Sequence, residues 1–80
     1  MEEYIFIFKT NFTTNMTAVI VSGELLVSTY YFKSNIDTLE TILETVKDYI
    51  PKKVILIGRT SLLKELADYY EKMEVEIEWR

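Results

Sequence analysis

The chain has 80 residues, enough for one domain spanning 1–80, and its apolar content of 49% is too high for a disordered segment. It contains neither cysteine nor histidine, which excludes disulfide bonds, thiolate or imidazole metal ligands and the commonest general base. The formal charge is −4 and the basic residues do not cluster, so the composition counts against nucleic acid as a partner.

The first residues predict a cytoplasmic location. Met1-Glu2-Glu3 is acidic and leads into five apolar residues, Tyr4–Phe8. A signal peptide needs a basic start and a longer apolar stretch, and a membrane-spanning helix needs about 20 apolar residues. We therefore expect neither secretion nor insertion into a membrane.

Three strands are expected in the first 32 residues. Tyr4–Phe8 is an unbroken run of β-forming residues, typical of a strand buried on both faces. A polar turn, Asn11–Asn15, separates it from Met16–Val21 and Leu25–Phe32, which are rich in β-branched and aromatic residues. Gly23-Glu24 between the last two suits a type II′ hairpin turn. The resulting register pairs Ser22 with Leu25, Ile20 with Val27 and Ala18 with Thr29.

The apolar spacing then changes to that of an amphipathic helix over residues 36–50. Asp37 can cap its first turn, with Glu40 three residues on completing a capping-box-like pair. Pro51 ends it, because proline disfavours a helical residue before it. The apolar stripe of this helix consists of Ile36, Leu39, Ile42, Leu43, Val46, Tyr49 and Ile50.

A second buried strand, Val54–Ile57, ends at Gly58, and Thr60 or Ser61 caps a second helix. The chain closes with Glu74–Arg80, whose strict alternation indicates a strand with one buried and one charged face. The apolar side of the second helix consists of Leu62, Leu63, Leu66, Ala67, Tyr70 and Met73.

The element order βββαβαβ predicts an α/β fold with a five-stranded mixed sheet in the order 3-2-1-4-5. Sequential hairpins place the first three strands side by side, and each helix-containing connection forms a right-handed parallel crossover. The first crossover returns beside the first strand, because that strand is apolar throughout. Both crossovers run in the same direction, so both helices are expected on one face of the sheet.

This arrangement resembles the opening of the ribonuclease H-like superfold, over the whole chain and by element order alone. The resemblance implies catalytic acids on the first strand, on the first helix and near the end of the fourth strand. Tyr4–Phe8 and Val54–Gly58 contain no acid, and only Glu40, Glu44 or Asp48 on the helix could match. A two-metal site cannot be built from one carboxylate, so we expect a non-catalytic version without a metal or cofactor.

The same topology leaves the second face of the sheet without cover. One alternate set of the first strand must point outward, either Tyr4, Phe6 and Phe8 or Ile5 and Ile7, together with Val54 and Leu56 or Ile55 and Ile57. We expect Glu74, Glu76 and Glu78 to line the rim of this face. An apolar centre with an acidic rim is typical of a protein interface. In the alternative interpretation, the aromatic residues Tyr30-Tyr31-Phe32 and the loops fold over the face.

Two further candidate sites each have a plain structural interpretation. Gly58-Arg59-Thr60-Ser61 joins a strand to a helix N-terminus, where backbone amides, hydroxyls and a guanidinium could hold a phosphate or nucleotide; a turn and helix cap need the same residues. Glu74, Glu76 and Glu78 share a strand face and could attract a cation or basic partner, but hard cations usually need ligands from several segments, so a solvated edge is the favoured interpretation.

The sequence therefore favours a non-enzymatic protein-interaction module, a regulator or inhibitor such as a phage or mobile-element accessory protein. It would bind a protein partner or form a homo-oligomer, most simply a dimer, through the uncovered face. The expected interface residues are Ile5, Ile7, Ile55, Ile57, Glu74, Glu76 and Glu78. The alternative is a small phosphate- or nucleotide-binding domain that uses Gly58–Ser61.

Overall fold

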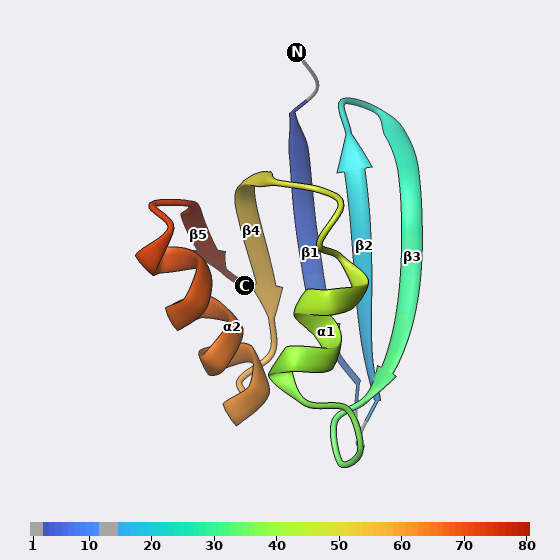
Figure 1. The fold of residues 1–80 in the computed structure, drawn as a ribbon, viewed down its shortest axis with the longest axis vertical. Coiled ribbons are helices and arrows are strands. Elements are labelled where there is room, and N and C mark those ends of the chain that lie inside the picture. Colours follow the sequence, from blue (N-terminus) through green and yellow to red (C-terminus); the bar gives the residue numbers. More distant parts are fainter. Residues whose placement is uncertain (1–2, 12–14) are drawn as a thin grey trace.

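The computed structural model describes residues 3–11 and 15–80, and its seven elements follow the predicted order (Figure 1). The sheet order is β3-β2-β1-β4-β5, with β1 antiparallel to β2 and parallel to β4. The predicted α/β class and strand order are therefore confirmed. The elements are β1 Tyr4–Thr10, β2 Asn15–Ser22, β3 Leu25–Lys33, α1 Leu39–Thr45, β4 Pro51–Ile57, α2 Ser61–Lys72 and β5 Glu76–Trp79.

Both helices lie on one face of the sheet, as expected from two crossovers of the same hand (Figure 1). They bury their apolar stripes against alternate residues of the strands, which contribute Phe6 and Phe8 from β1 and Val54 and Leu56 from β4. The rings of Phe6, Phe8 and Tyr70 contact one another in this core, with centroids 5.9–6.4 Å apart. In the described chain, no helix is long and apolar enough to cross a bilayer.

The hairpin turn is confirmed, but the register of β3 differs from the predicted one. Gly23 has φ +62°, as the first central residue of a type II′ turn requires. The second central residue, Glu24, has a negative φ, because the one non-glycine residue with positive φ in residues 3–11 and 15–80 is Glu74. Ser22 pairs with Leu25 as predicted, whereas a β-bulge follows. Beyond the bulge, Ala18 pairs with Tyr30 instead of Thr29.

The bulge reverses the facing of the aromatic residues in β3. One extra residue in β3 turns every later side chain to the opposite face, because strand side chains alternate with period two. Tyr30 and Phe32 therefore face the helices, and Tyr31 is exposed on the other side. The predicted pairs Ile20–Val27 and Ala18–Thr29 were wrong for this reason.

Helix α1 is shorter than predicted at both ends. Its N-cap is Thr38, whose hydroxyl accepts from the Thr41 amide, while the Asp37 carboxylate accepts from the Lys33 amide and closes the turn after β3. At the other end, Pro51 pairs with Tyr4 as the first residue of β4, so residues 46–50 must cross from the helix to the sheet. The predicted cap at Asp37 and the helical assignment of Ile36, Tyr49 and Ile50 were therefore wrong.

The C-terminal strand begins at Glu76, two residues later than predicted. Glu74 has φ +62° and sits just after α2. Its amide donates to the Glu71 carbonyl, and the Val75 amide donates to the Tyr70 carbonyl, the two bonds of a Schellman helix terminus. Glu74 therefore ends α2 and does not belong to the strand.

The predicted turn from Asn11 to Asn15 falls largely on residues 12–14, outside the described residues.

Candidate interaction surface

The side of the sheet that faces away from the helices carries a contiguous set of Ile and Val side chains. We call it the outward face. Its register is continuous: Ile7 of β1 pairs with Val19 of β2 on one side and with Ile55 of β4 on the other. The outward face consists of Ile5, Ile7, Val19, Val21, Ile55 and Ile57.

These six residues lie outside the core that the helices cover. Five of them are only partly buried, and the sixth, Ile55, has an exposed fraction of 7%. None of the six packs against the core cluster. Within the described residues, both helices lie on the opposite side of the sheet (Figure 1). Of the two alternate sets left open by the sequence, the isoleucines face outward and the larger aromatic rings of β1 face the core.

The rim along β5 is a network of ion pairs. The Lys53 Nζ lies 2.6 Å from the Glu78 Oε1 and 3.3 Å from the Glu76 Oε2, and the Arg80 guanidinium also bonds to Glu78. Hydrogen bonds from Lys53 and then from Arg80 hold the pKa of the Glu78 carboxyl below its ordinary value. The expected rim at Glu76 and Glu78 is present, and two cations offset its acidity. Glu74 lies outside it, because it belongs to the helix terminus.

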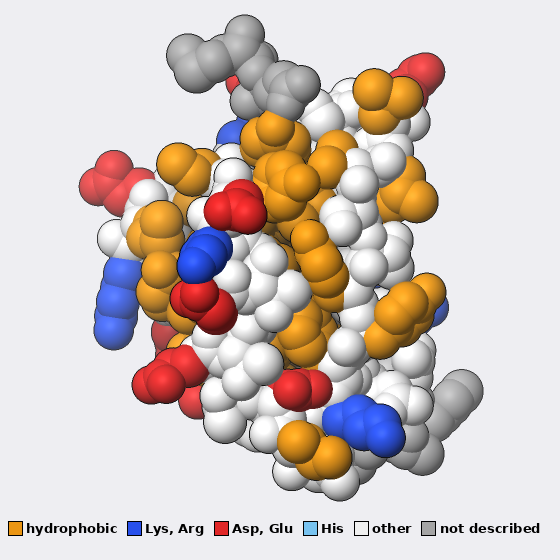
Figure 2. Space-filling view, turned by 45° about the vertical axis from the view of Figure 1, so that its right-hand side comes forward, with side chains coloured by type: hydrophobic (Ala, Val, Ile, Leu, Met, Phe, Trp, Pro, Cys, Tyr) orange, Lys and Arg blue, Asp and Glu red, His pale blue; other side chains and the backbone are white. Residues whose placement is uncertain are grey.

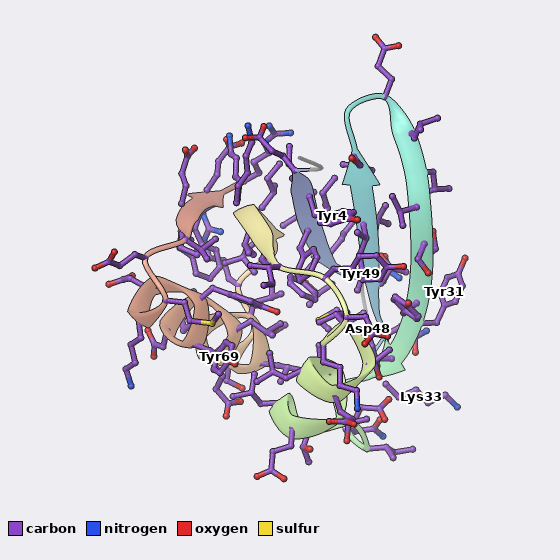
Figure 3. All side chains as sticks on the ribbon, turned by 45° about the horizontal axis from the view of Figure 1, so that its top comes forward. Tyr4, Tyr31, Lys33, Asp48, Tyr49 and Tyr69 are labelled. Carbon is purple, nitrogen blue, oxygen red and sulfur yellow. The ribbon has the colours of Figure 1, made fainter. Side chains whose placement is uncertain are left out.

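The opposite rim, along β3, is uncharged between its ends. Tyr31 pairs with Thr17, and its side chain is 79% exposed. Figure 3 shows the Tyr31 side chain projecting from β3 away from the body of the protein. Tyr30 and Phe32 pack toward the core, so this aromatic trio leaves the outward face open.

Charge is divided unevenly between the two layers. We call residues 37–50 and 61–74 the helical layer; it contains eight acidic and three basic residues, a net charge of −5. The five strands contain four lysines and two glutamates, a net charge of +2. Acidic side chains accordingly dominate the charged groups around the helices in Figure 2.

In the loop from Gly58 to Ser61, the polar groups interact with other parts of the chain. The Thr60 hydroxyl accepts from the Leu63 amide and caps α2, which begins at Ser61. The Arg59 guanidinium donates to the Gly58 carbonyl and lies 5.2 Å from the centroid of the Trp79 ring. This arrangement fits the helix-cap interpretation. Whether the loop also holds an anion stays a prediction.

The acids that could match the ribonuclease H-like pattern remain dispersed. Glu40 and Glu44 are exposed on α1, and Asp48 lies in the turn after that helix. The strands β1 and β4 contain no acid. Among residues 3–11 and 15–80, no group of three acidic side chains is placed to bind one metal ion.

Comparison of the chain with protein-family models, with curated proteins and with solved structures returned no match. From the sequence, the expected interface residues included Ile5, Ile7, Ile55 and Ile57, although the facing of β1 and β4 was left open. Val19 and Val21 were missed as members, although their alternation with the buried Ala18 and Ile20 was a usable signal.

Proposed function

We propose that this chain is a non-enzymatic protein-interaction module that binds a protein partner through its outward face. One observation carries the proposal: six Ile and Val side chains stand side by side on three central strands, and the helices cover only the other face. A contiguous apolar patch on a folded domain is typical of an interaction site.

The borders of the patch fit this role. An interface commonly has an apolar centre surrounded by polar groups that remain hydrated. Here Lys53, Glu76 and Glu78 provide charged groups at one border, and Thr17 and Thr29 provide hydroxyls at the other. The proposal retains the resemblance to the ribonuclease H-like superfold, as a version that binds and does not cleave.

The test compares two identical substitutions at different places. Ile7→Lys puts a charge at the centre of the outward face, and Ile50→Lys puts the same charge at an exposed position before β4. Tagged wild-type protein and both variants are used to capture partners from the source cells. We expect a partner that binds wild type and Ile50→Lys equally and is lost with Ile7→Lys.

A milder variant separates binding from folding. Val19→Thr keeps the β-branched shape while adding a hydroxyl to the outward face. Each variant is first checked for cooperative unfolding. A captured partner that binds folded Ile7→Lys and Val19→Thr as tightly as it binds wild type would show that the outward face is not the binding site.

A further inference from the structure

The two edge strands of the sheet, β5 and β3, differ in how well they are protected against pairing with a strand of another molecule. An edge strand presents unpaired backbone groups to solvent, and proteins protect such edges with short strands and charged side chains. β5 has both protections: it is four residues long and carries Glu76 and Glu78. β3 is nine residues long and uncharged from Leu25 to Phe32, and its protections, a bulge after Leu26 and the charge of Lys33, lie at its two ends.

The backbone of β3 is available for pairing on its outer side. Its ladder partner is β2, and within the described chain no other backbone hydrogen bond reaches Leu25–Phe32. The bulge lies near the start of the strand, so Ser28–Phe32 forms a regular stretch. At Lys33 the amide donates to the Asp37 carboxylate and the carbonyl accepts from the Ile36 and Asp37 amides, so the available edge ends before Lys33. Figure 1 shows β3 at the margin of the molecule, with no described element beyond it.

Apolar side chains are unusually exposed along this strand. Leu25 is 73% exposed and Leu26 is 65% exposed, in addition to Tyr31. A long, apolar and unpaired edge is a template for the addition of another strand.

The charges at the ends of β3 identify the orientation of the added strand. Glu24 precedes the uncharged run and Lys33 ends it, and both side chains are exposed. If two copies of β3 pair antiparallel, Glu24 of each copy comes near Lys33 of the other at both ends. Parallel pairing would bring Glu24 near Glu24 and Lys33 near Lys33. Opposite charges across paired strands stabilise, and like charges destabilise.

We propose that the β3 edge pairs antiparallel with the β3 edge of a second copy of this chain, which joins the two sheets into one of ten strands. The two-fold axis of such a pair is perpendicular to the sheet, so both outward faces lie on the same side. This inference concerns the edge and goes beyond the binding of a partner by the outward face. Each can fail while the other holds.

The experiment measures absolute mass by light scattering after size-exclusion chromatography, over at least a tenfold concentration range. We expect wild type to approach twice the 9.5 kDa chain mass as concentration rises. Glu24→Lys and Lys33→Glu each place like charges at both ends of the pair and should weaken it about tenfold. The double variant Glu24→Lys/Lys33→Glu should restore wild-type association, which a purely structural role of either residue would not do.

Two further variants complete the design. Thr29→Lys places two lysines near the two-fold axis and should give a monomer even if the end charges contribute little. Lys64→Glu/Glu65→Lys makes the same pair of charge changes on exposed positions of α2 and should leave the mass unchanged. Unfolding curves confirm that each variant is folded.

Three outcomes would overturn the proposal. One is a wild-type monomer at every concentration, and another is a dimer that neither the single charge variants nor Thr29→Lys weakens. The third is a double variant that stays as weak as the singles. A dimer lost in Ile7→Lys and retained in Thr29→Lys would assign self-association to the outward face instead.

Discussion

Gly58 allows a quantitative test of how β4 connects to α2. Its φ is +128°, and a Cβ built at this position would lie 2.1 Å from the Thr10 Oγ1 and 3.1 Å from the Leu63 Cδ1. An L-residue in such a backbone conformation costs about 1–3 kcal/mol. Forcing extra volume into a packed site costs about 1–3 kcal/mol more. Gly58→Ala should therefore reduce the free energy of unfolding by about 4 kcal/mol.

Gly23 provides the matched control. It also has positive φ, +62°, but a Cβ there would have no heavy atom within 4 Å. Gly23→Ala should therefore lose only the conformational contribution, about 1–3 kcal/mol. An 80-residue domain has a total stability of about 4–12 kcal/mol, so Gly58→Ala should remove a third of it or more and Gly23→Ala a smaller part.

The assay is urea denaturation followed by far-ultraviolet circular dichroism and by the fluorescence of Trp79, the one tryptophan of the chain. A double-mutant cycle isolates the steric part, because Thr10→Ala removes the atom nearest to the added methyl group. Thr10→Ala should recover about 1–2 kcal/mol of the Gly58→Ala loss, within the cost of overpacking. The reasoning would be refuted if Gly58→Ala cost no more than Gly23→Ala, or if the two Gly58 and Thr10 changes were additive.

Three other predictions follow from local geometry. Glu74→Gly should raise the free energy of unfolding by about 0.5–1 kcal/mol, because glycine adopts the positive φ of the helix terminus without strain. A lower free energy of unfolding, measured by urea denaturation, would contradict this prediction. Deletion of Val27 removes the extra residue of the bulge and keeps the later side chains on their present faces. Unfolding should therefore stay cooperative, and the free energy of unfolding should fall by no more than about 1 kcal/mol. A non-cooperative unfolding curve would contradict the register. The Glu78 pKa is lowered by Lys53 and Arg80, so its contribution is complete above the ordinary pKa of 4.5 and is lost as the pH falls through the lowered value. Glu78→Gln should therefore lose less stability on acidification than wild type, and parallel pH profiles of the two proteins would exclude this linkage.

The topology could be predicted because the strands and helices are strongly patterned. β1 and β4 are apolar on both faces, which places them in the interior of the sheet, and the helical crossovers fix their parallel pairing. The facing of β1 could have been inferred from size as well. Phe6 and Phe8 bury more apolar area than Ile5 and Ile7, so a thin core gains more from the aromatic set.

The differences between sequence and structure arise where residue types carry no local signal. The bulge in β3 lies in the run Leu25–Phe32, which has β-forming residues on both faces and no glycine, so the pattern cannot specify the register there. Asp37 and Thr38 are adjacent and both can cap a helix, and only the turn to Lys33 decides between them. Glu74 occupies a position where glycine is usual, so the end of α2 was not marked.

The same limits apply to the candidate interaction surface. Which residues of β1 and β4 share a face follows from alternation, but the pairing of Lys53 with Glu76 and Glu78 depends on the register between β4 and β5. Sequence spacing alone showed three glutamates and predicted an acidic rim. It could not show the cation between two of them.

The uneven division of charge between the two layers gives the molecule an electric dipole directed across the sheet. A strongly acidic protein at a distance would repel the helical layer and turn the sheet toward itself before contact. Because the net charge of the whole chain is −4, such a protein is repelled overall, so the orientation decides which face it meets first and does not accelerate association. Both the overall repulsion and the orientation should fade as added salt shortens the Debye length from about 30 Å at 0.01 M to about 8 Å at 0.15 M. A basic protein would instead be drawn first to the helices and reach the outward face more slowly.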